Sequence, residues 1–316
     1  MKIKVAILGY GNLGKALEEN IIKEKIFKLV GIFTRRSNIS SPFSTPVFNR
    51  QSLLNFQNKI DLLLLCSGSQ SDMLNDAPFF TKYFNTINTF DTHDLIEKLQ
   101  SKLNKIAKKH NHFCIVSAGW DPGLFSQIRL MFSSILSSPC NSFWGPGTSL
   151  GHTQAVKQIP ALEDALAITL PNPKAIAQAK TGKVSDEKHS RQVFVVSNNP
   201  QQNKQIEKSI KQMDHYFKNQ TVSVKFVSQE KLNSIKNFSH SGQIFCTNLA
   251  KNNNILLHMS ASMQSNPDLT AKIVLSYARV IKKLIKKYPS GAYTPLHFSP
   301  LDLSVTSIKQ TIKTFC

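Results

Sequence analysis

The sequence predicts an α/β protein whose N-terminal part is a Rossmann-type, doubly wound parallel sheet. Short apolar segments recur at Lys2–Leu8, Leu29–Phe33, Asp61–Cys66 and Phe113–Val116, and stretches with helix-spaced apolar positions lie between them. Continuous apolar runs are typical of parallel strands that are buried on both faces. Repeated strand–loop–helix units of this kind form a parallel sheet with helices on both sides.

The regularity changes after about residue 120. Gln192–Val196 and Val222–Val227 have the pattern of strands in a second sheet, and we expect these strands to be antiparallel. The region as a whole is predicted to be α+β with a mixed or antiparallel sheet. Near the end, Ile273–Leu284 has a helical apolar stripe beside several lysines, which favours a helix packed on a sheet over one lying on a membrane. We therefore expect a first domain over 1–118, completed by about 265–316, and a second region over 119–264.

Composition excludes several classes of protein. Of the 316 residues 41% are hydrophobic and 18% charged, as in an ordinary globular protein, and no apolar run approaches the roughly 20 residues of a membrane span. The five cysteines show no metal-ligand spacing, so we expect no metal and no disulfide framework. The 39 Lys+Arg against 19 Asp+Glu give +20, but the lysines are dispersed and no nucleic-acid motif is present. We expect a soluble cytoplasmic protein without a nucleic-acid or membrane partner.

A glycine-rich turn follows the first strand directly and opens a helix, with Gly9, Gly11 and Gly14 in the G-x-G-x-x-G pattern. This is the structural context that makes the motif a dinucleotide-binding fingerprint. The helix N-terminus offers amide donors and partial positive charge to phosphates.

The end of the second strand indicates which nucleotide binds. An NAD site places an acidic residue about 20 positions beyond the glycines, whereas this chain has Thr34, Arg35 and Arg36. Two guanidinium groups suit a 2′-phosphate, which accepts charge-assisted hydrogen bonds from them. The sequence therefore predicts NADP(H). Ser67–Ser69, after the third strand, lies at the carboxyl edge where such sheets bind ligands.

Several segments of the chain are distinctive. They read VAILGYGNLG (Val5–Gly14), LVGIFTRR (Leu29–Arg36), SAGWDPG (Ser117–Gly123), FWGPG (Phe143–Gly147), TLP (Thr169–Pro171), RQVFVV (Arg191–Val196) and NPD (Asn266–Asp268). Together they resemble the meso-diaminopimelate D-dehydrogenase family, from the N-terminus to about Asp268. GWDPG and FWGPG at this separation are not general Rossmann features, which makes the resemblance specific.

The resemblance implies an activity and an assembly. The family deaminates the D-centre of meso-2,6-diaminopimelate oxidatively with NADP, giving L-2-amino-6-oxoheptanedioate, ammonia and NADPH. The reverse direction serves lysine and cell-wall precursor synthesis. Members are homodimers with nucleotide, dimerisation and substrate domains.

The resemblance also implies roles for individual residues. The acidic groups at the reacting D-centre are Asp91 and Asp121, which suit holding the amine and stabilising an iminium. The pocket wall and the contacts to the distal carboxylate are Trp144, Leu150, Gly151, Thr169, Arg191, His240 and Asn266. The nucleotide contacts are Gly9, Tyr10, Gly11, Asn12, Leu13, Gly14, Thr34, Arg35, Arg36, Cys66, Ser67, Gly68, Ser69, Gln70, Thr89, Phe90, Asp91, Ala118, Gly119, Trp120, Asp121 and Pro122.

Some positions depart from the family pattern. Leu150 stands where members carry glutamine, Gln154 where they carry aspartate, and Asn88 and Phe90 where they carry aspartate and tyrosine. Loss of polar groups in the pocket loop could relax the specificity by ten-fold or more, at roughly 1.5–3 kcal/mol per hydrogen bond to a charged group. Two alternatives to the specific dehydrogenase therefore stay open: a relaxed NADP-dependent D-amino-acid dehydrogenase, and a non-catalytic NADPH-binding sensor.

Overall fold

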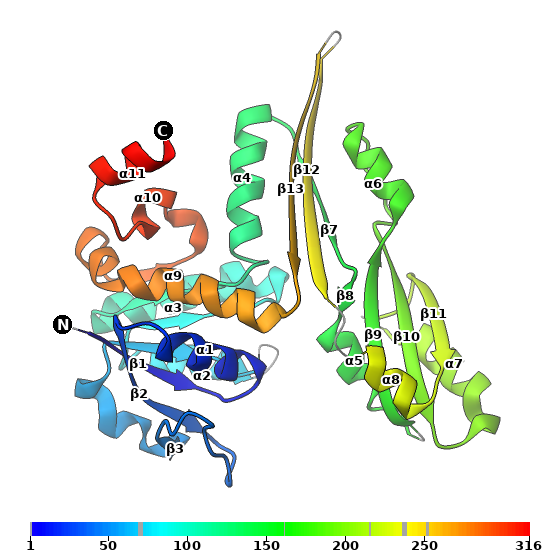
Figure 1. Ribbon diagram of the computed structural model, residues 1–316, viewed down its shortest axis with the longest axis horizontal. Coiled ribbons are helices and arrows are strands. Elements are labelled where there is room, and N and C mark those ends of the chain that lie inside the picture. Colours follow the sequence, from blue (N-terminus) through cyan, green and yellow to red (C-terminus); the bar gives the residue numbers. More distant parts are fainter. Residues whose placement is uncertain (1, 69–71, 161, 215, 236–238, 251–252) are drawn as a thin grey trace. The chain divides into compact units, whose positions relative to one another are not determined.

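The computed structural model describes residues 2–68, 72–160, 162–214, 216–235, 239–250 and 253–316, and Figure 1 shows its elements. The chain divides into two compact units. Unit 1 comprises Met1–Gln127 and Pro267–Cys316, and unit 2 comprises Ile128–Asn266.

Unit 1 contains a seven-stranded sheet in the order β14-β6-β5-β4-β1-β2-β3, and every neighbouring pair is parallel. The predicted Rossmann-type sheet is confirmed. Its strands are β1 (Ile3–Leu8), β2 (Phe27–Thr34), β3 (Val47–Asn49), β4 (Leu62–Leu65), β5 (Thr86–Asn88), β6 (Phe113–Ile115) and β14 (Gly291–Tyr293). Its helices are α1 (Asn12–Ile22), η1 (Arg50–Lys59), α2 (Asp72–Phe80), η2 (His93–Leu95), α3 (Ile96–His110), α9 (Asn266–Lys287, from its second residue), η4 (Pro295–His297), α10 (Pro300–Leu303) and α11 (Ile308–Phe315).

Two apolar cores cover the two faces of this sheet. Val5 and Ile7 of β1 pack in one core with α1 and α9, whereas Ala6 and Leu8 pack in the other with α2 and α3. Alternate residues of one strand therefore meet different helices, which explains why the buried strands are apolar without interruption. The apolar stripe of α9 lies in the first core, with Tyr277 only 1% exposed, so the predicted sheet-packed helix is confirmed.

Unit 2 contains two smaller sheets. The first has the order β11-β10-β9-β8 and the second β13-β12-β7. The strands are β7 (Cys140–Trp144), β8 (Gly147–Thr148), β9 (Leu162–Pro171), β10 (His189–Ser197), β11 (Thr221–Phe226), β12 (His240–Ala250) and β13 (Asn253–Met263). The helices are α5 (Leu150–Val156), α6 (Pro173–Lys180), η3 (Pro200–Gln202), α7 (Asn203–Lys211) and α8 (Gln229–Ile235), and α4 (Leu124–Leu136) crosses the boundary between the units.

The first of these sheets is mixed, in agreement with the broader prediction of a mixed or antiparallel sheet. β9 pairs with β10 antiparallel, but β10 and β11 run parallel. The narrower expectation of antiparallel strands at Gln192–Val196 and Val222–Val227 is therefore wrong for that pair. The reason is that α7 lies between the two strands in the chain, and a helical crossover returns the chain in the same direction.

The described residues lack membrane-spanning helices and clusters of metal ligands. No helix in these ranges has both the length and the apolar character needed to cross a bilayer. Over the same part of the chain, no group of three or more His, Cys, Asp or Glu side chains could hold a metal ion.

The C-terminal part of unit 1 contains a buried carboxylate, which gives a first prediction. Asp302 is 2% exposed and accepts hydrogen bonds from Lys287 Nζ at 2.5 Å, Tyr288 Oη at 2.9 Å and Ser299 N at 2.9 Å. Burial raises the pKa of Asp302, but the hydrogen bonds from Lys287, Ser299 and Tyr288 outweigh it and lower the pKa to about 2.

We expect Asp302→Asn to lower the free energy of unfolding at pH 7 by about 1–2 kcal/mol, since an amide replaces a carboxylate that accepts several hydrogen bonds. A depressed pKa stabilises the fold above the unfolded value of about 3.9, and this stabilisation is lost as the pH falls toward 2. Urea unfolding between pH 7 and 2 should therefore show a shallower acid dependence for the variant. Glu19→Gln, which removes an exposed ion pair with Lys23, is the control and should cost less than about 0.5 kcal/mol. Equal pH dependence of Asp302→Asn and the wild type would contradict the prediction.

Candidate functional site

The glycine turn between β1 and α1 is fixed by close backbone contacts. Gly9 has φ +96°, and a Cβ there would lie 2.7 Å from the carbonyl oxygen of Cys66. A Cβ on Gly14 would lie 2.3 Å from the carbonyl oxygen of Gly9. A Cβ on Gly11 would meet no atom within 4 Å, so this position is open toward a ligand. Each glycine thus has the role that a dinucleotide turn requires of it.

Tyr10 contributes its main chain to this turn. Its side chain is 3% exposed, and its hydroxyl donates to Glu18, whose other carboxylate oxygen accepts from Ser41 Oγ at 2.5 Å. Burial, followed by the contact with Glu18, raises the pKa of Tyr10 to about 12. The phenol therefore stays protonated, and the Glu18 carboxylate of α1 links it to Ser41 in the loop after β2.

The basic end of β2 lies beside the glycine turn. Arg36 Nη2 donates to the carbonyl oxygen of Tyr10, and Arg36 N donates to Thr34 Oγ1 at 3.2 Å. Arg35 forms an ion pair of 2.5 Å with Asp72 at the start of α2, while its side chain remains 61% exposed. Sequence analysis did not single out Asp72. The two arginines are thus held by partners within unit 1, and the guanidinium group of Arg36 lies against the glycine turn.

The segment after β4 borders the same turn. Cys66 N donates to the carbonyl oxygen of Leu8 at 2.7 Å, and burial raises the pKa of its thiol, which makes it a packing group. Ser67 Oγ donates to Asp76, which also pairs with Arg50. Gly68 is exposed, and Ser69 and Gln70 lie outside the described residues.

The loops after β5 and β6 carry the two predicted acidic residues. Asp91 is exposed and follows Thr89 and Phe90, although the Phe90 side chain lies fully buried in a core of unit 1. Asp121 lies in a turn that is closed by Gly119 N donating to the carbonyl oxygen of Pro122 at 3.1 Å. Because β5 and β6 are neighbouring parallel strands, both loops leave the same edge of the sheet. Ala118 is buried there, and Trp120 packs edge-to-face on Phe125.

In unit 2, the turn between β7 and β8 passes from one sheet to the other and is fixed on both sides. Gly145 has φ +100°, and a Cβ there would lie 2.3 Å from the carbonyl oxygen of Thr169. Gly145 N donates to the carbonyl oxygen of Ser241 at 2.7 Å, and Ser241 Oγ donates back to that of Gly145 at 2.6 Å. These contacts place the turn against β9 and β12.

Trp144, at the start of this turn, is held by a residue that sequence analysis missed. Its backbone N–H donates to His189 Nε2 at 2.8 Å, and the two rings stack with centroids 5.2 Å apart and an interplanar angle of 25°. His189 is the first residue of β10, so this contact joins the two sheets of unit 2. Burial, followed by the charge of Arg191, lowers the pKa of His189 to about 4. The imidazole is therefore neutral at pH 7 and able to accept this hydrogen bond.

The predicted carboxylate-binding residues come together on one face of the mixed sheet. Gly147, Thr169 and Arg191 occupy paired positions on β8, β9 and β10. Arg191 Nη1 donates to Thr169 Oγ1. The His240 ring lies over Gly147, where a Cβ would be 3.0 Å from His240 Cδ2, and its Nε2 bonds the carbonyl oxygen of Thr148 at 2.8 Å.

Two nitrogens of this cluster remain available. Among the described residues, Arg191 Nε and His240 Nδ1 are buried side-chain atoms without a hydrogen-bond partner. Buried polar atoms in a folded protein are normally paired, so such atoms mark a place where a ligand group or water binds. Thr169, His240 and Arg191 can therefore surround one carboxylate.

The remaining predicted pocket residues lie close to these elements in the chain. Leu150 and Gly151 begin α5, and Gly151 is exposed. Asn266 follows β13 by three residues, and the last residue of β13, Met263, pairs with His240. The predicted site residues thus fall into two groups, one in each unit. The nucleotide set with Asp91 and Asp121 belongs to unit 1, and the carboxylate cluster with Trp144 and Asn266 belongs to unit 2.

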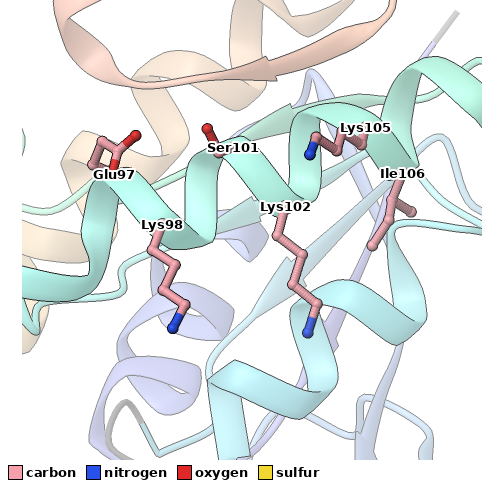
Figure 2. A pocket seen from close by; sticks show the side chains of 6 residues that line it. All are labelled: Glu97, Lys98, Ser101, Lys102, Lys105 and Ile106. Carbon is pink, nitrogen blue, oxygen red and sulfur yellow. The ribbon is translucent and has the colours of Figure 1, made fainter.

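A hollow on the outer side of α3 has a different character (Figure 2). It is lined by Glu97, Lys98, Ser101, Lys102, Lys105 and Ile106. Lys98 and Lys102 extend from the helix in the same direction in Figure 2, and all three lysines are exposed. The buried residues of α3 are Leu99, Leu103 and Ala107 on its other side. The hollow is the solvated face of an amphipathic helix, in keeping with the dispersed lysines of the sequence.

Comparisons with known proteins cover both units. Residues 119–265 match the family described as the diaminopimelic acid dehydrogenase C-terminal domain. The chain is 34% identical over 316 residues to a meso-diaminopimelate D-dehydrogenase from Corynebacterium glutamicum, covering 98% of each chain.

Solved structures give the same result. A C. glutamicum DAP dehydrogenase in complex with DAP has a TM-score of 0.92 at 33% identity, covering 100% of this chain and 99% of the other. An engineered D-amino acid dehydrogenase bound to NADP+ has a TM-score of 0.87 at 32% identity, covering 100% of both chains.

The parallel sheet, the glycine turn and these likenesses define a dinucleotide-dependent oxidoreductase of the Rossmann class. The likeness extends through unit 2, whose fold is not a general feature of that class. The chain belongs to the meso-diaminopimelate D-dehydrogenase family.

The contact between His189 and Trp144 gives a second prediction. The chain has two tryptophans, so in a Trp120→Phe background the fluorescence reports Trp144 alone. We expect His189→Ala to shift the Trp144 emission to longer wavelength and to increase its quenching by acrylamide, because the indole loses its stacking partner and gains contact with water. His258→Ala is a matched control, because the His258 ring stacks on Phe245 in the same unit, with the ring centroids 4.3 Å apart. An unchanged spectrum for His189→Ala, or an equal shift in the control, would refute the assigned role.

Proposed function

We propose that the chain is an NADP-dependent dehydrogenase acting on the D-centre of meso-2,6-diaminopimelate. The products are L-2-amino-6-oxoheptanedioate, ammonia and NADPH, the reaction is reversible, and it serves lysine and diaminopimelate synthesis. The observation that carries this proposal is the full-length similarity to enzymes of that name, combined with the cluster of Arg191, Thr169 and His240.

The residues of unit 1 fit NADP. The open Cβ position of Gly11 leaves room for a pyrophosphate against the backbone, and the N-terminus of α1 offers amide donors. Arg35 and Arg36 supply the guanidinium groups for a 2′-phosphate. When bound, NADP accepts the hydride that leaves the amine-bearing carbon. The proposed nucleotide-binding domain is 1–118 with about 265–316, and further contacts come from the predicted residues after β4, β5 and β6.

The protein's part in the reaction is positioning and charge placement. Asp91 and Asp121 hold the nitrogen at the D-centre, whose ammonium form first gives one proton to solvent. They then stabilise the positive charge that develops on nitrogen as the neutral amine loses its hydride and becomes an iminium. Water then attacks the imine carbon and ammonia leaves. Neither carboxylate forms a covalent bond with the substrate, so both act through hydrogen bonding and charge.

The second carboxylate of the substrate sets the specificity. Arg191 binds it, with Thr169 and His240 as further partners, while Trp144, Leu150 and Gly151 form the pocket wall and Asn266 adds a polar contact. A charge-assisted hydrogen bond contributes about 1.5–3 kcal/mol, which corresponds to roughly ten-fold or more in affinity. We propose on this ground that diaminopimelate is preferred over simpler D-amino acids.

We propose that the protein is located in the cytoplasm, forms a homodimer and binds no nucleic acid. Support for self-association comes from exposed apolar side chains in unit 2. Leu130, Met131 and Ile135 of α4 are 46–64% exposed, and Leu249 and Leu256 are exposed on β12 and β13. We infer that these side chains contribute to a contact between two copies of the chain. We propose that the region 119–264 serves both substrate binding and dimerisation.

The third prediction concerns the catalytic activity of the purified protein. The purified protein with NADP should form NADPH on addition of meso-diaminopimelate, with little rate on the LL and DD isomers or on D-alanine. Arg36→Ala should raise the KM for NADP by about 10- to 100-fold, since it removes a charge-assisted contact to the 2′-phosphate. The KM for NAD should change little, which is the internal control. Comparable rates on D-alanine would identify a relaxed D-amino-acid dehydrogenase, and tight NADPH binding without turnover on any substrate would identify a sensor.

Arg191 gives the fourth prediction. Arg191→Leu should raise the KM for meso-diaminopimelate by about 10- to 100-fold with a smaller effect on kcat, because the distal carboxylate loses its cationic partner. D-Alanine has no distal carboxylate, so its kcat/KM in the same variant should stay within about two-fold of the wild type. A parallel loss on both substrates would show that Arg191 supports the fold and not the selection of the second carboxylate.

A further inference from the structure

The side chain of Asn88 connects the two loops that carry Asp91 and Asp121. Asn88 is the last residue of β5 and is fully buried. Its Oδ1 accepts hydrogen bonds from the backbone N–H groups of Phe90 and Ser117, each at 3.2 Å. Its carbonyl oxygen accepts a third bond, from Ala118 N at 2.9 Å. One residue therefore fixes the exit of the chain from β5 and from β6.

The bond to Ser117 holds a backbone conformation that would otherwise be costly. Ser117 has φ +61°, in the left-handed region, and is 2% exposed. A non-glycine residue stays there only where its surroundings fix it, and such residues gather at functional sites. The conformation of Ser117 directs the chain into the turn with Asp121, so the acceptor at Asn88 also determines where that carboxylate lies.

This junction also contains polar atoms that the protein leaves unpaired. Within the described part of the chain, Asn88 Nδ2 and Ser117 Oγ are buried and have no hydrogen-bond partner. A polar core group would normally have all its partners. Of the two functional atoms of the Asn88 amide, only the oxygen is used by the protein, which distinguishes the junction from ordinary core packing.

We propose that Asn88 is a positioning residue for the dehydrogenase reaction, setting the relative placement of Asp91 and Asp121 through its Oδ1. This inference rests on the proposed function, in which both carboxylates face the ammonium group of the D-centre. A shift of about 1 Å in such a group can reduce a rate by about 100-fold. Loss of the acceptor should therefore affect kcat far more than the binding of NADP.

The test compares four forms of the full-length protein. Asn88→Leu keeps the size of the side chain but removes the acceptor, and Asn88→Asp keeps an acceptor oxygen and removes the unpaired donor. Thr86→Val is the matched control, because Thr86 lies on the same strand, is fully buried, and its Oγ1 lies 3.0 Å from Thr81 Oγ1, away from both loops. All are compared with the wild type for kcat and KM with meso-diaminopimelate and NADP, and for Tm.

We expect Asn88→Leu to lower kcat by about 10- to 100-fold, with the KM for NADP within about three-fold of the wild type. Asn88→Asp should restore kcat to within about five-fold, and Thr86→Val should lower Tm without lowering kcat. Equal kcat values for Asn88→Leu and Thr86→Val, or equal losses in both Asn88 variants, would overturn the proposal. If Asn88→Leu does not fold, Asn88→Ala takes its place in the same comparison.

A second readout is independent of turnover. In a Trp144→Phe background, Trp120 next to Asp121 is the one remaining tryptophan of the chain. Its emission should shift in Asn88→Leu and stay unchanged in Asn88→Asp and Thr86→Val. An unshifted spectrum in Asn88→Leu would contradict the positioning role. Absence of turnover in the wild type would count against the proposed function alone.

Discussion

The carboxyl ends of parallel strands meet at one edge of a sheet, and the chemistry of unit 1 depends on this constraint. β1 ends in the glycine turn, β2 in Arg35 and Arg36, and β5 and β6 in the loops of the two aspartates. Backbone hydrogen bonds between neighbouring strands hold these ends in register, for example from Gly9 N to the carbonyl oxygen of Phe33 at 2.8 Å. The polar groups are therefore placed by the sheet, and the loops have only to be short and well hydrogen-bonded.

In unit 2, a turn that passes from one sheet to the other places the polar and aromatic side chains. The chain leaves β7 in an antiparallel sheet and enters β8 in the mixed sheet, and Gly145 makes this possible because no side chain would fit against Thr169. Trp144 is thereby held by His189 from the other sheet, and His240 lies over Gly147. Glycine at two positions of one turn thus brings Trp144 of one sheet close to His189 of the other, and His240 close to β8.

Sequence alone predicted the elements whose signal is local. The glycine turn, the buried strands and the stripe of α9 each carry their pattern within about a dozen residues, and each was found where expected. The pairing of β10 with β11 was not, because strand direction depends on a crossover and not on the strands themselves. The contacts of His189, and those of Asn88, which the sequence marked only as a departure from the family pattern, were not predicted for a related reason. Their partners are backbone groups of Ser117 and Trp144, and a backbone acceptor or donor leaves no trace in the sequence.

The net charge of +20 does not determine the local charge around Arg191. Arg191 is flanked by His152 and His189, and burial, followed by the charge of Arg191, lowers the pKa of both histidines to about 4. At neutral pH Arg191 is therefore the one charged group among these three side chains. Were both imidazoles protonated, the cluster would favour a multivalent anion instead. The surface lysines of α3 contribute to the total charge but lie in solvent, where salt screens them over about 10 Å. In the proposed site, the charge that meets the distal carboxylate is therefore set by Arg191 beside two neutral imidazoles, whatever the total charge of the chain.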